Sequence, residues 1–499
     1  MRLFFKGHDY KYAAEQILLM MFPEERPEYP EKAQKEEENA AFIKLSKGEA
    51  YHTASVKLFY GGKAARKTLR VKNSELTDKL TSDRLLQKIM KLAFYKAAVE
   101  ITGKNPVWGA LTGIRPGKIV TRQMEKGVSA EKAARVLVKE YFATPERAEL
   151  CKDTARASLD AKKLLSEKDI ALYIGIPFCP TRCAYCSFVS NSVEKSMKLI
   201  EPFLEALYKE IDESAKLVKD LGLNVISVYM GGGTPTTLSA DQMESLLKKL
   251  SESFDLSNVR EFTIEAGRPD TITPEKLRAI EKGGADRVSI NPQTMSDEVL
   301  RAIGRRHSAQ QVVEAYEQTR ENTKTLVNMD LIAGLPADTA ESFCDTLDKV
   351  LSLGPENVTV HTLALKKGTK ITLEGTKIPD ENEVSEMLDY SVKRLREEGY
   401  YPYYLYRQKF MSGGFENVGW CREGAESLYN ILIMEELCTI LALGGGASTK
   451  LVAPETGHIE RIFNPKYPLE YIQNIDSVNE KKKYMAEFYK REIFTSEEK

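Results

Sequence analysis

Between residues 171 and 365, short apolar runs rich in β-branched side chains alternate with amphipathic stretches. The runs predict strands and the stretches predict helices, because one face recurs every two residues in a strand and every 3.6 in a helix. The predicted strands are residues 171–178, 225–230, 261–266, 287–291, 326–332 and 357–365, and the predicted helices include 194–219, 241–251, 274–283 and 339–353. Six such βα units predict an α/β fold with a partial (β/α)6 barrel.

The residues before and after this βα pattern predict different kinds of domain. Strand patterns at residues 1–6 and 51–60 and helical patterns at 80–102 and 130–141 predict an α+β domain over residues 1–166. The barrel is expected over residues 167–370, because its pattern stops at residue 365. A predicted helix at 381–398, an aromatic run at 400–406, a glycine-punctuated block at 413–448 and a charged helix at 479–489 predict a mixed C-terminal domain over 371–499.

The composition restricts the possible partners and cellular compartment but does not identify a function. The 72 Lys and Arg residues balance 73 Asp and Glu residues, so the net charge of -1 favours neither a nucleic acid nor an anionic membrane as partner. The apolar run at residues 17–22 is too short to span a bilayer, and no charged and apolar leader opens the chain. The seven cysteines are unevenly spaced and predict no disulfide framework. These features predict a cytoplasmic protein in a reducing compartment, without a membrane span.

Three of the cysteines lie in one loop. Cys179, Cys183 and Cys186 are spaced Cys-x3-Cys-x2-Cys directly after the first predicted barrel strand. Thiolates are the usual ligands of iron–sulfur clusters, and a 4Fe–4S cluster held by three of them keeps one iron open to another ligand. A structural zinc site and reduced thiols are the alternatives, but zinc sites normally add a second Cys or His pair, which this sequence lacks.

Polar residues follow the next strands. A Gly-Gly-Gly-Thr turn at residues 231–234 ends the second, Glu265 ends the third, Gln293 ends the fourth, Arg305 lies beyond the following helix, and Asp330 lies in the fifth. Glycines let a backbone approach a ligand, carboxylates accept hydrogen bonds from hydroxyls, and arginine binds carboxylates. Taken singly, each of these residues is equally well explained as a partner in a surface ion pair or as a hydrogen-bonded polar group in the core. Together, at the strand ends where barrels place their chemistry, they predict a cofactor site.

These motifs resemble those of the radical S-adenosylmethionine (SAM) superfamily, including the aromatic Tyr185 before the last cysteine. Blocks 173–188, 231–235, 287–293 and 330–336 resemble the oxygen-independent coproporphyrinogen III oxidase family, and blocks 108–116, 405–409, 415–419 and 442–448 resemble its coproporphyrinogen dehydrogenase HemZ subgroup. The resemblance implies that Cys179, Cys183 and Cys186 bind a 4Fe–4S cluster. It implies that SAM is bound by Tyr173, Gly231, Gly232, Gly233, Thr234, Glu265, Gln293, Arg305 and Asp330.

The resemblance also implies a reaction in haem biosynthesis. The reduced cluster would cleave SAM, and the resulting radical would take hydrogen from a propionate of coproporphyrinogen III. Loss of carbon dioxide and an electron would leave a vinyl group, and two rounds would give protoporphyrinogen IX. A reducing donor such as flavodoxin or ferredoxin is implied. Charge for the propionates could come from Arg407, Lys409 and Arg422, or from Lys366 and Lys367, although a solvated basic face explains each equally well.

Two positions depart from the family pattern. Phe188 stands where the characterised oxidases carry a further cysteine, and Gly175 stands where they carry histidine. Two alternatives therefore stay open: a haem chaperone of the HemW type, and another radical SAM reaction on a tetrapyrrole. HemW chaperones carry a His-Asn-x-x-Tyr-Trp pattern near the C-terminus, and the comparable segment here begins Tyr429-Asn430, which argues against the chaperone.

Overall fold

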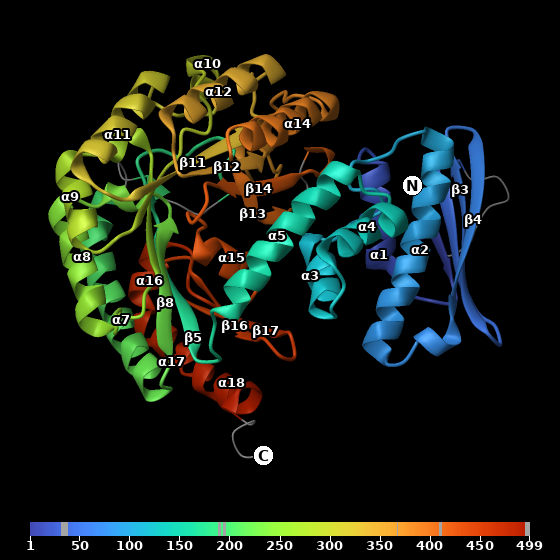
Figure 1. Ribbon diagram of the computed structural model, residues 1–499, viewed down its shortest axis with the longest axis horizontal. Helices are drawn as coiled ribbons and strands as arrows, with labels where there is room; N and C mark the ends of the chain where they lie inside the picture. Colours follow the sequence, from blue (N-terminus) through green and yellow to red (C-terminus); the bar gives the residue numbers. More distant parts are fainter. Residues whose placement is uncertain (31–37, 188–190, 193–195, 367, 409–411, 495–499) are drawn as a thin grey trace. The chain divides into compact units, whose positions relative to one another are not determined.

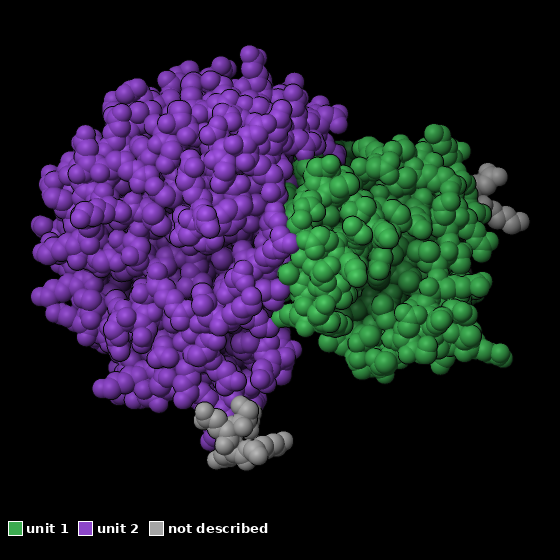
Figure 2. All heavy atoms as spheres, in the orientation of Figure 1, with its two compact units in different colours: residues 1–152, 413–415 green, residues 153–412, 416–499 purple. Residues whose placement is uncertain are grey.

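The computed structural model describes residues 1–30, 38–187, 191–192, 196–366, 368–408 and 412–494 (Figure 1). The chain forms two compact units, residues Met1–Lys152 with Gly413–Phe415 and residues Asp153–Ser412 with Glu416–Lys499 (Figure 2). The expected division into three domains at residues 166 and 370 stays a prediction. None of the described helices combines the length and apolar character needed to cross a membrane.

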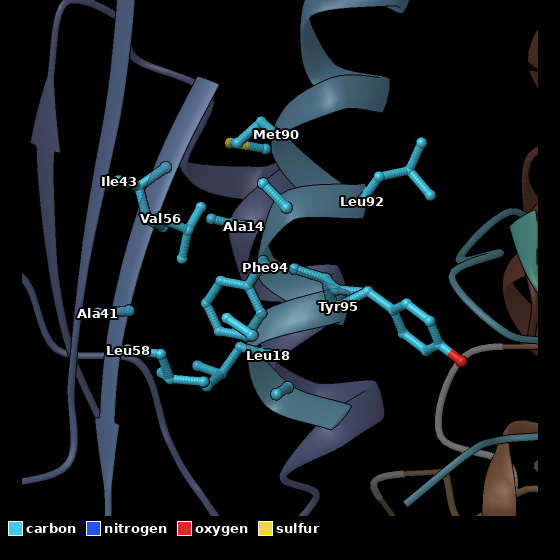
Figure 3. Close-up of a cluster of buried hydrophobic side chains, with 14 of the residues drawn as sticks. Ala14, Leu18, Ala41, Ile43, Val56, Leu58, Met90, Leu92, Phe94 and Tyr95 are labelled. Atoms are coloured by element: carbon cyan, nitrogen blue, oxygen red, sulfur yellow. The ribbon is translucent and has the colours of Figure 1, made fainter. Parts of the chain in front are cut away.

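The first unit is built on a four-stranded sheet in the order β1 (Arg2–Lys6), β2 (Ala40–Lys47), β3 (Tyr51–Tyr60), β4 (Lys63–Lys72). β1 and β2 are parallel and the other pairs are antiparallel. Helices α1 (Lys11–Met21) and α2 (Lys79–Thr102) pack their apolar sides against one face of the sheet, where Leu18 and Phe94 meet Val56 and Leu58 (Figure 3). The predicted strands 1–6 and 51–60 and helix 80–102 are confirmed, whereas β2 and β4 were not predicted.

Three helices follow in the chain: α3 (Gly117–Glu125), α4 (Ala130–Tyr141) and α5 (Pro145–Lys163). α4 matches the prediction for residues 130–141. Its start is set by Ser129, whose side chain accepts a hydrogen bond from the Lys132 backbone N–H, a normal N-cap.

The second unit contains the predicted partial barrel, which is confirmed. Six parallel strands lie in the order β12 (Asn357–Thr362), β11 (Leu326–Ala333), β10 (Arg287–Ile290), β9 (Glu261–Gly267), β8 (Asn224–Gly232), β5 (Asp169–Ile176) within a sheet that does not close. Helices connect them: α7 (Ile200–Asp220), α8 (Ala240–Ser253), α9 (Pro274–Lys282), α10 (Asp297–Ala302), α11 (Ala309–Asn322) and α12 (Ala340–Leu353). The first residues of the predicted helix 194–219 lie outside the described part of the chain.

The barrel pattern was expected to stop at residue 365, but later strands extend this sheet at both edges. β13 (Tyr401–Arg407) and β14 (Glu416–Cys421) continue it antiparallel beside β12. At the other edge β15 (Thr439–Gly444) pairs parallel with β5 and adds a seventh parallel strand, followed by β16 (Ser448–Ala453) and β17 (His458–Phe463). A short pair, β6 (Phe178–Cys179) with β7 (Asn191–Ser192), follows β5.

The remaining helices of this unit are α13 (Lys370–Glu374), α14 (Glu381–Glu397), α15 (Leu428–Glu435), α16 (Pro468–Gln473), α17 (Ile475–Lys482) and α18 (Tyr484–Glu492). α14 confirms the helix predicted at 381–398. The single helix predicted at 479–489 is wrong, because the chain tightens at Lys483, whose N–H bonds to the Glu480 carbonyl three residues back.

A buried carboxylate joins the C-terminal helices to the barrel. Glu210 on α7 is 0% exposed and accepts hydrogen bonds from the Gly444 N–H and the Asn464 side chain, both at 2.7 Å, and from Tyr471 and Lys482. Four donors satisfy the carboxylate, as a buried charge requires. The network fixes the turn that follows β15.

Candidate functional site

A cavity of about 600 Å³ lies at the C-terminal ends of the parallel strands, inside the second unit. Its lining includes Cys179, Cys183 and Cys186, together with Tyr173, Gly232, Gly233, Thr234, Glu265, Gln293, Arg305 and Asp330. Gly231 belongs to the same turn and lies against the Glu265 side chain. The residues that the sequence singled out are therefore brought to one place, although the ligands assigned to them stay predictions.

The cysteine loop is held at the cavity by backbone hydrogen bonds. The Ala184 N–H donates to the Ile303 carbonyl at 2.9 Å, and the Cys186 N–H donates to the Cys183 carbonyl at 3.1 Å. Among the described residues, no three His, Cys, Asp or Glu side chains are placed to hold a single metal ion. A loop of three cysteines matches the thiolate ligation of an iron–sulfur cluster.

The glycine turn after β8 runs close to the cysteine strand. The Gly233 and Thr234 N–H groups donate to the carbonyls of Ile176 and Phe178, both at 2.7 Å. A Cβ atom on Gly233 would lie 2.3 Å from the Phe178 carbonyl oxygen, so this approach requires glycine. The Thr234 hydroxyl lies 3.6 Å from the Cys179 sulfur. The turn and the cysteine loop thus form one connected structure.

Two carboxyl groups in the cavity differ in protonation. Burial raises the pKa of Glu265 to about 7; a hydrogen bond from the Tyr229 hydroxyl, at 2.5 Å, opposes this shift, and the Asp330 charge adds to it. Burial would also raise the pKa of Asp330, but the nearby His361 side chain, 3.8 Å away, and a hydrogen bond from Asn328 at 2.8 Å outweigh it and lower that pKa. Asp330 is therefore an acceptor at neutral pH, whereas Glu265 is close to half-protonated and can also donate.

Gln293 offers an unused acceptor to a ligand. Its φ of 69° is in the left-handed region, and its backbone bonds to β11 through the Asp330 carbonyl at 2.9 Å and the Ile332 N–H at 3.0 Å. The side chain is 6% exposed, and its Oε1 atom has no hydrogen-bond partner among the described residues. An unpartnered buried acceptor is costly, which indicates a site built for a donor from a ligand.

Arg305 supports the cysteine loop from the side. One guanidinium nitrogen donates to the Asn291 carbonyl at 2.6 Å and the other to the Tyr185 hydroxyl at 3.2 Å. Tyr185 lies between Cys183 and Cys186, so Arg305 reaches the cysteine motif directly.

Four tyrosines of the cavity lining were not predicted. Tyr229 and Tyr429 stack with ring centroids 4.5 Å apart, and Tyr404 and Tyr406 form a second stacked pair at 6.3 Å. Tyr404 and Tyr406 belong to the aromatic run at 400–406, which was visible in the sequence. Their place in the cavity was not, because it depends on β13 joining the barrel sheet.

Tyr429 is held in place by residues at the start of β9, the end of the strand away from Glu265. Glu261, at the start of that strand, accepts hydrogen bonds from the Ser427 hydroxyl at 2.7 Å and the Tyr429 N–H at 3.2 Å. Arg287 donates to the Ala425 carbonyl at 3.1 Å. These buried contacts fix the start of α15 and present its side chains to the cavity.

Of the basic residues considered for a substrate carboxylate, Lys366 lines the cavity and is exposed. Arg422 instead lies over the Tyr400 ring, 4.5 Å from its centroid, and Arg407 is buried outside the cavity lining. Lys367 and Lys409 lie outside the described residues, as does Phe188.

Comparisons with known proteins agree with this geometry. A family model of the radical SAM superfamily matches residues 173–350. The chain is 41% identical over 396 residues to the oxygen-independent coproporphyrinogen-III oxidase-like protein HemZ of Bacillus subtilis, covering 78% of this chain and 79% of that protein. It is 28% identical over 306 residues to the heme chaperone HemW of Haemophilus influenzae, covering 61% of this chain and 76% of the chaperone.

Among solved structures, the coproporphyrinogen III oxidase HemN of Escherichia coli, described as a radical SAM enzyme, superposes with a TM-score of 0.51 at 26% identity. The match covers 65% of this chain and 73% of that structure.

Proposed function

Because this chain belongs to the radical SAM superfamily, in the family of the coproporphyrinogen-III oxidase-like protein HemZ, we propose that it oxidatively decarboxylates coproporphyrinogen III. Two propionates would become vinyl groups, which gives protoporphyrinogen IX. The observation that supports this most is the cavity, where a three-cysteine loop, polar strand-end residues and tyrosine rings share one space. Electron delivery by a flavodoxin or ferredoxin, and a cytoplasmic location, stay predictions.

The superfamily uses a 4Fe–4S cluster and SAM, and the residues at the cavity fit both. Cys179, Cys183 and Cys186 would hold the cluster. The glycine turn at 231–233, with Thr234, and the strand-end residues Tyr173, Glu265, Gln293, Arg305 and Asp330 would hold SAM, and the unpartnered Gln293 oxygen suits a donor of that ligand. When bound, the pair supplies one-electron chemistry that takes a hydrogen atom from an unactivated carbon.

The chain's own residues would bind and orient the substrate. The stacked tyrosines offer flat apolar faces that pack on a large ring and exclude water from it. The exposed cation Lys366 lies at the cavity and suits a propionate carboxylate through a charge-assisted hydrogen bond. Asp330, ionised at neutral pH, accepts hydrogen bonds but repels a second carboxylate, so a propionate would be directed toward Lys366.

The test is anaerobic reconstitution with SAM, a reductant and coproporphyrinogen III, followed by chromatography of the porphyrins and measurement of released carbon dioxide. Cys183→Ala should abolish SAM cleavage, whereas Cys344→Ala, outside the cavity, should not. Lys366→Met should raise the KM for substrate about tenfold or more, because it removes a hydrogen bond to a charged group. Lys370→Met, which removes an exposed lysine outside the cavity, is its control. SAM cleavage without carbon dioxide release would refute the decarboxylation.

A haem chaperone is the second candidate, favoured by the HemW relatives. His361 is the one histidine among the described residues that line the cavity, and its Nε2 atom lies 3.8 Å from an Asp330 oxygen. In such a chaperone, His361 would be the histidine of this cavity available to haem iron. Stoichiometric haem binding that His361→Ala abolishes, in protein that releases no carbon dioxide, would support the chaperone.

A further inference from the structure

The sheet of the first unit has one covered face and one open face. Ile43, Val56 and Leu58 point toward α1 and α2 (Figure 3), and Leu3 belongs to the same buried cluster. Because side chains alternate across a strand, the intervening residues form the other face. Three phenylalanines lie on this open face: Phe4 and Phe42 stack with ring centroids 4.8 Å apart, and Phe59 meets the edge of Phe42 at 6.0 Å.

Within the four strands, the charged residues of this face are all positive. Its strands contain no Asp or Glu, although the whole chain has a net charge of -1. Net charge therefore hides a strongly basic surface. The exposed cations of this face are Lys6, Lys44, Lys57, Arg66, Arg70 and Lys72.

The strand register places some of these cations directly opposite each other. Lys6 pairs with Lys44 across β1 and β2, and Lys57 pairs with Arg66 across β3 and β4. Like charges in opposite positions destabilise a sheet. Phe42 on β2 lies between Phe4 on β1 and Lys57 on β3, so the phenylalanines continue the line of residues that contains the Lys57 and Arg66 pair. The Lys57 ammonium lies over the Phe59 ring, 4.5 Å from its centroid, which offsets part of the repulsion from Arg66, and bound anions would offset more of it.

We propose that this face, the aromatic–basic face of β1–β4, binds single-stranded nucleic acid. Phosphates would lie between the opposed cations, and unpaired bases would stack on the phenylalanines. An acidic protein or an anionic membrane would use the charges, but three flat rings set among cations match the stacked bases and phosphates of a single strand most directly. This site is separate from the cavity, and the proposal does not depend on the reaction proposed there.

The test is fluorescence anisotropy of the full-length protein with a labelled 12-nucleotide oligouridylate and the matching oligothymidylate. We expect binding that weakens with salt. The variant Lys44→Glu/Lys57→Glu/Arg66→Glu should abolish it, and Phe42→Ala should weaken it about tenfold. Replacing the same three cations by Gln should lower the slope of log affinity against log salt by about 2. The matched control reverses Lys248, Lys349 and Lys393, exposed lysines of the second unit.

Thermal melting supplies a readout that does not depend on a fluorescent probe. Oligouridylate should raise the melting temperature of the wild type and leave that of the Glu variant unchanged. No binding at low salt, equal loss of binding in the control variant, an unchanged affinity in Phe42→Ala, or preference for polyglutamate or phosphatidylserine vesicles over both oligonucleotides would overturn the proposal.

Discussion

The substitution Gly233→Ala tests whether the glycine turn and the cysteine loop act as one structure. The added Cβ would lie 2.3 Å from the Phe178 oxygen, 2.8 Å from its carbonyl carbon and 2.9 Å from the Ile176 oxygen. All three atoms are backbone, so no side chain can turn away. An ordinary carbon–oxygen contact of about 3.3 Å requires a displacement of roughly 1 Å.

That displacement falls next to Cys179, because Phe178 precedes it and accepts the Thr234 hydrogen bond. A misplacement of about 1 Å at reacting groups costs on the order of 100-fold in rate, and overpacking costs about 1–3 kcal/mol of stability. We therefore expect Gly233→Ala to fold and to cleave SAM about 100-fold more slowly. SAM cleavage is measured by the deoxyadenosine formed per reconstituted cluster, and stability by urea unfolding.

Two other glycines calibrate the result. A Cβ on Gly113 would meet nothing within 4 Å, so Gly113→Ala should behave as wild type. A Cβ on Gly231 would lie 2.9 Å from the flexible end of Glu265, so Gly231→Ala should have an intermediate effect. A Gly233→Ala protein that cleaves SAM within threefold of the wild-type rate would refute the reasoning.

Three further predictions follow from buried groups. Lys482→Met should destabilise the protein by about 3–5 kcal/mol in urea unfolding, because it leaves Glu210 charged and buried, and Glu210→Gln should recover part of that loss in the double variant; additive losses would contradict the coupling. The pKa of Glu265, about 7 when folded against 4.5 when unfolded, means that the folded state holds more protons between those values, so stability should fall as pH rises through that window. Glu265→Gln should flatten this dependence, and an unchanged slope in urea midpoints from pH 5 to 8 would contradict the assignment. Gln293→Gly should raise the unfolding midpoint, because it relieves about 1 kcal/mol of left-handed strain, and should weaken SAM binding in calorimetry; unchanged SAM affinity would argue against a contact from its side chain.

The barrel was predictable because each of its strands and helices carries its own signal. Buried parallel strands read as apolar runs, and the polar residues that end them stand out against those runs. The pattern alone therefore places Glu265, Gln293 and Asp330 at one edge of the sheet. Their protonation does not follow from the pattern, because it depends on neighbours such as Tyr229 and His361 from other strands.

The strands that were not predicted either lack a regular spacing of apolar residues or pair with a strand that is distant in the sequence. β4 reads as a polar segment, since every second position from Arg66 to Lys72 faces the open side of its sheet. β15 lies in a glycine-rich block that resembles a loop, and its partner β5 is far away in the chain. The cavity tyrosines were missed for the same reason. An aromatic run such as 400–406 is normally part of a core, and only the pairing of β13 with β14 brings Tyr404 and Tyr406 to the cavity.

The pairing of β15 with β5 has a consequence for how the chain is made. In this pair Thr439 lies beside Ile170, so about 270 residues separate the two strands in the sequence. At a translation rate of roughly 5–20 residues per second, β5 leaves the ribosome about 15 to 50 seconds before its partner exists. During that interval an apolar strand edge next to the cysteine loop stays unpaired and open to association with other chains. We therefore expect completion of the cavity to come late in folding, because its lining includes residues of β15 and β16 as well as the barrel.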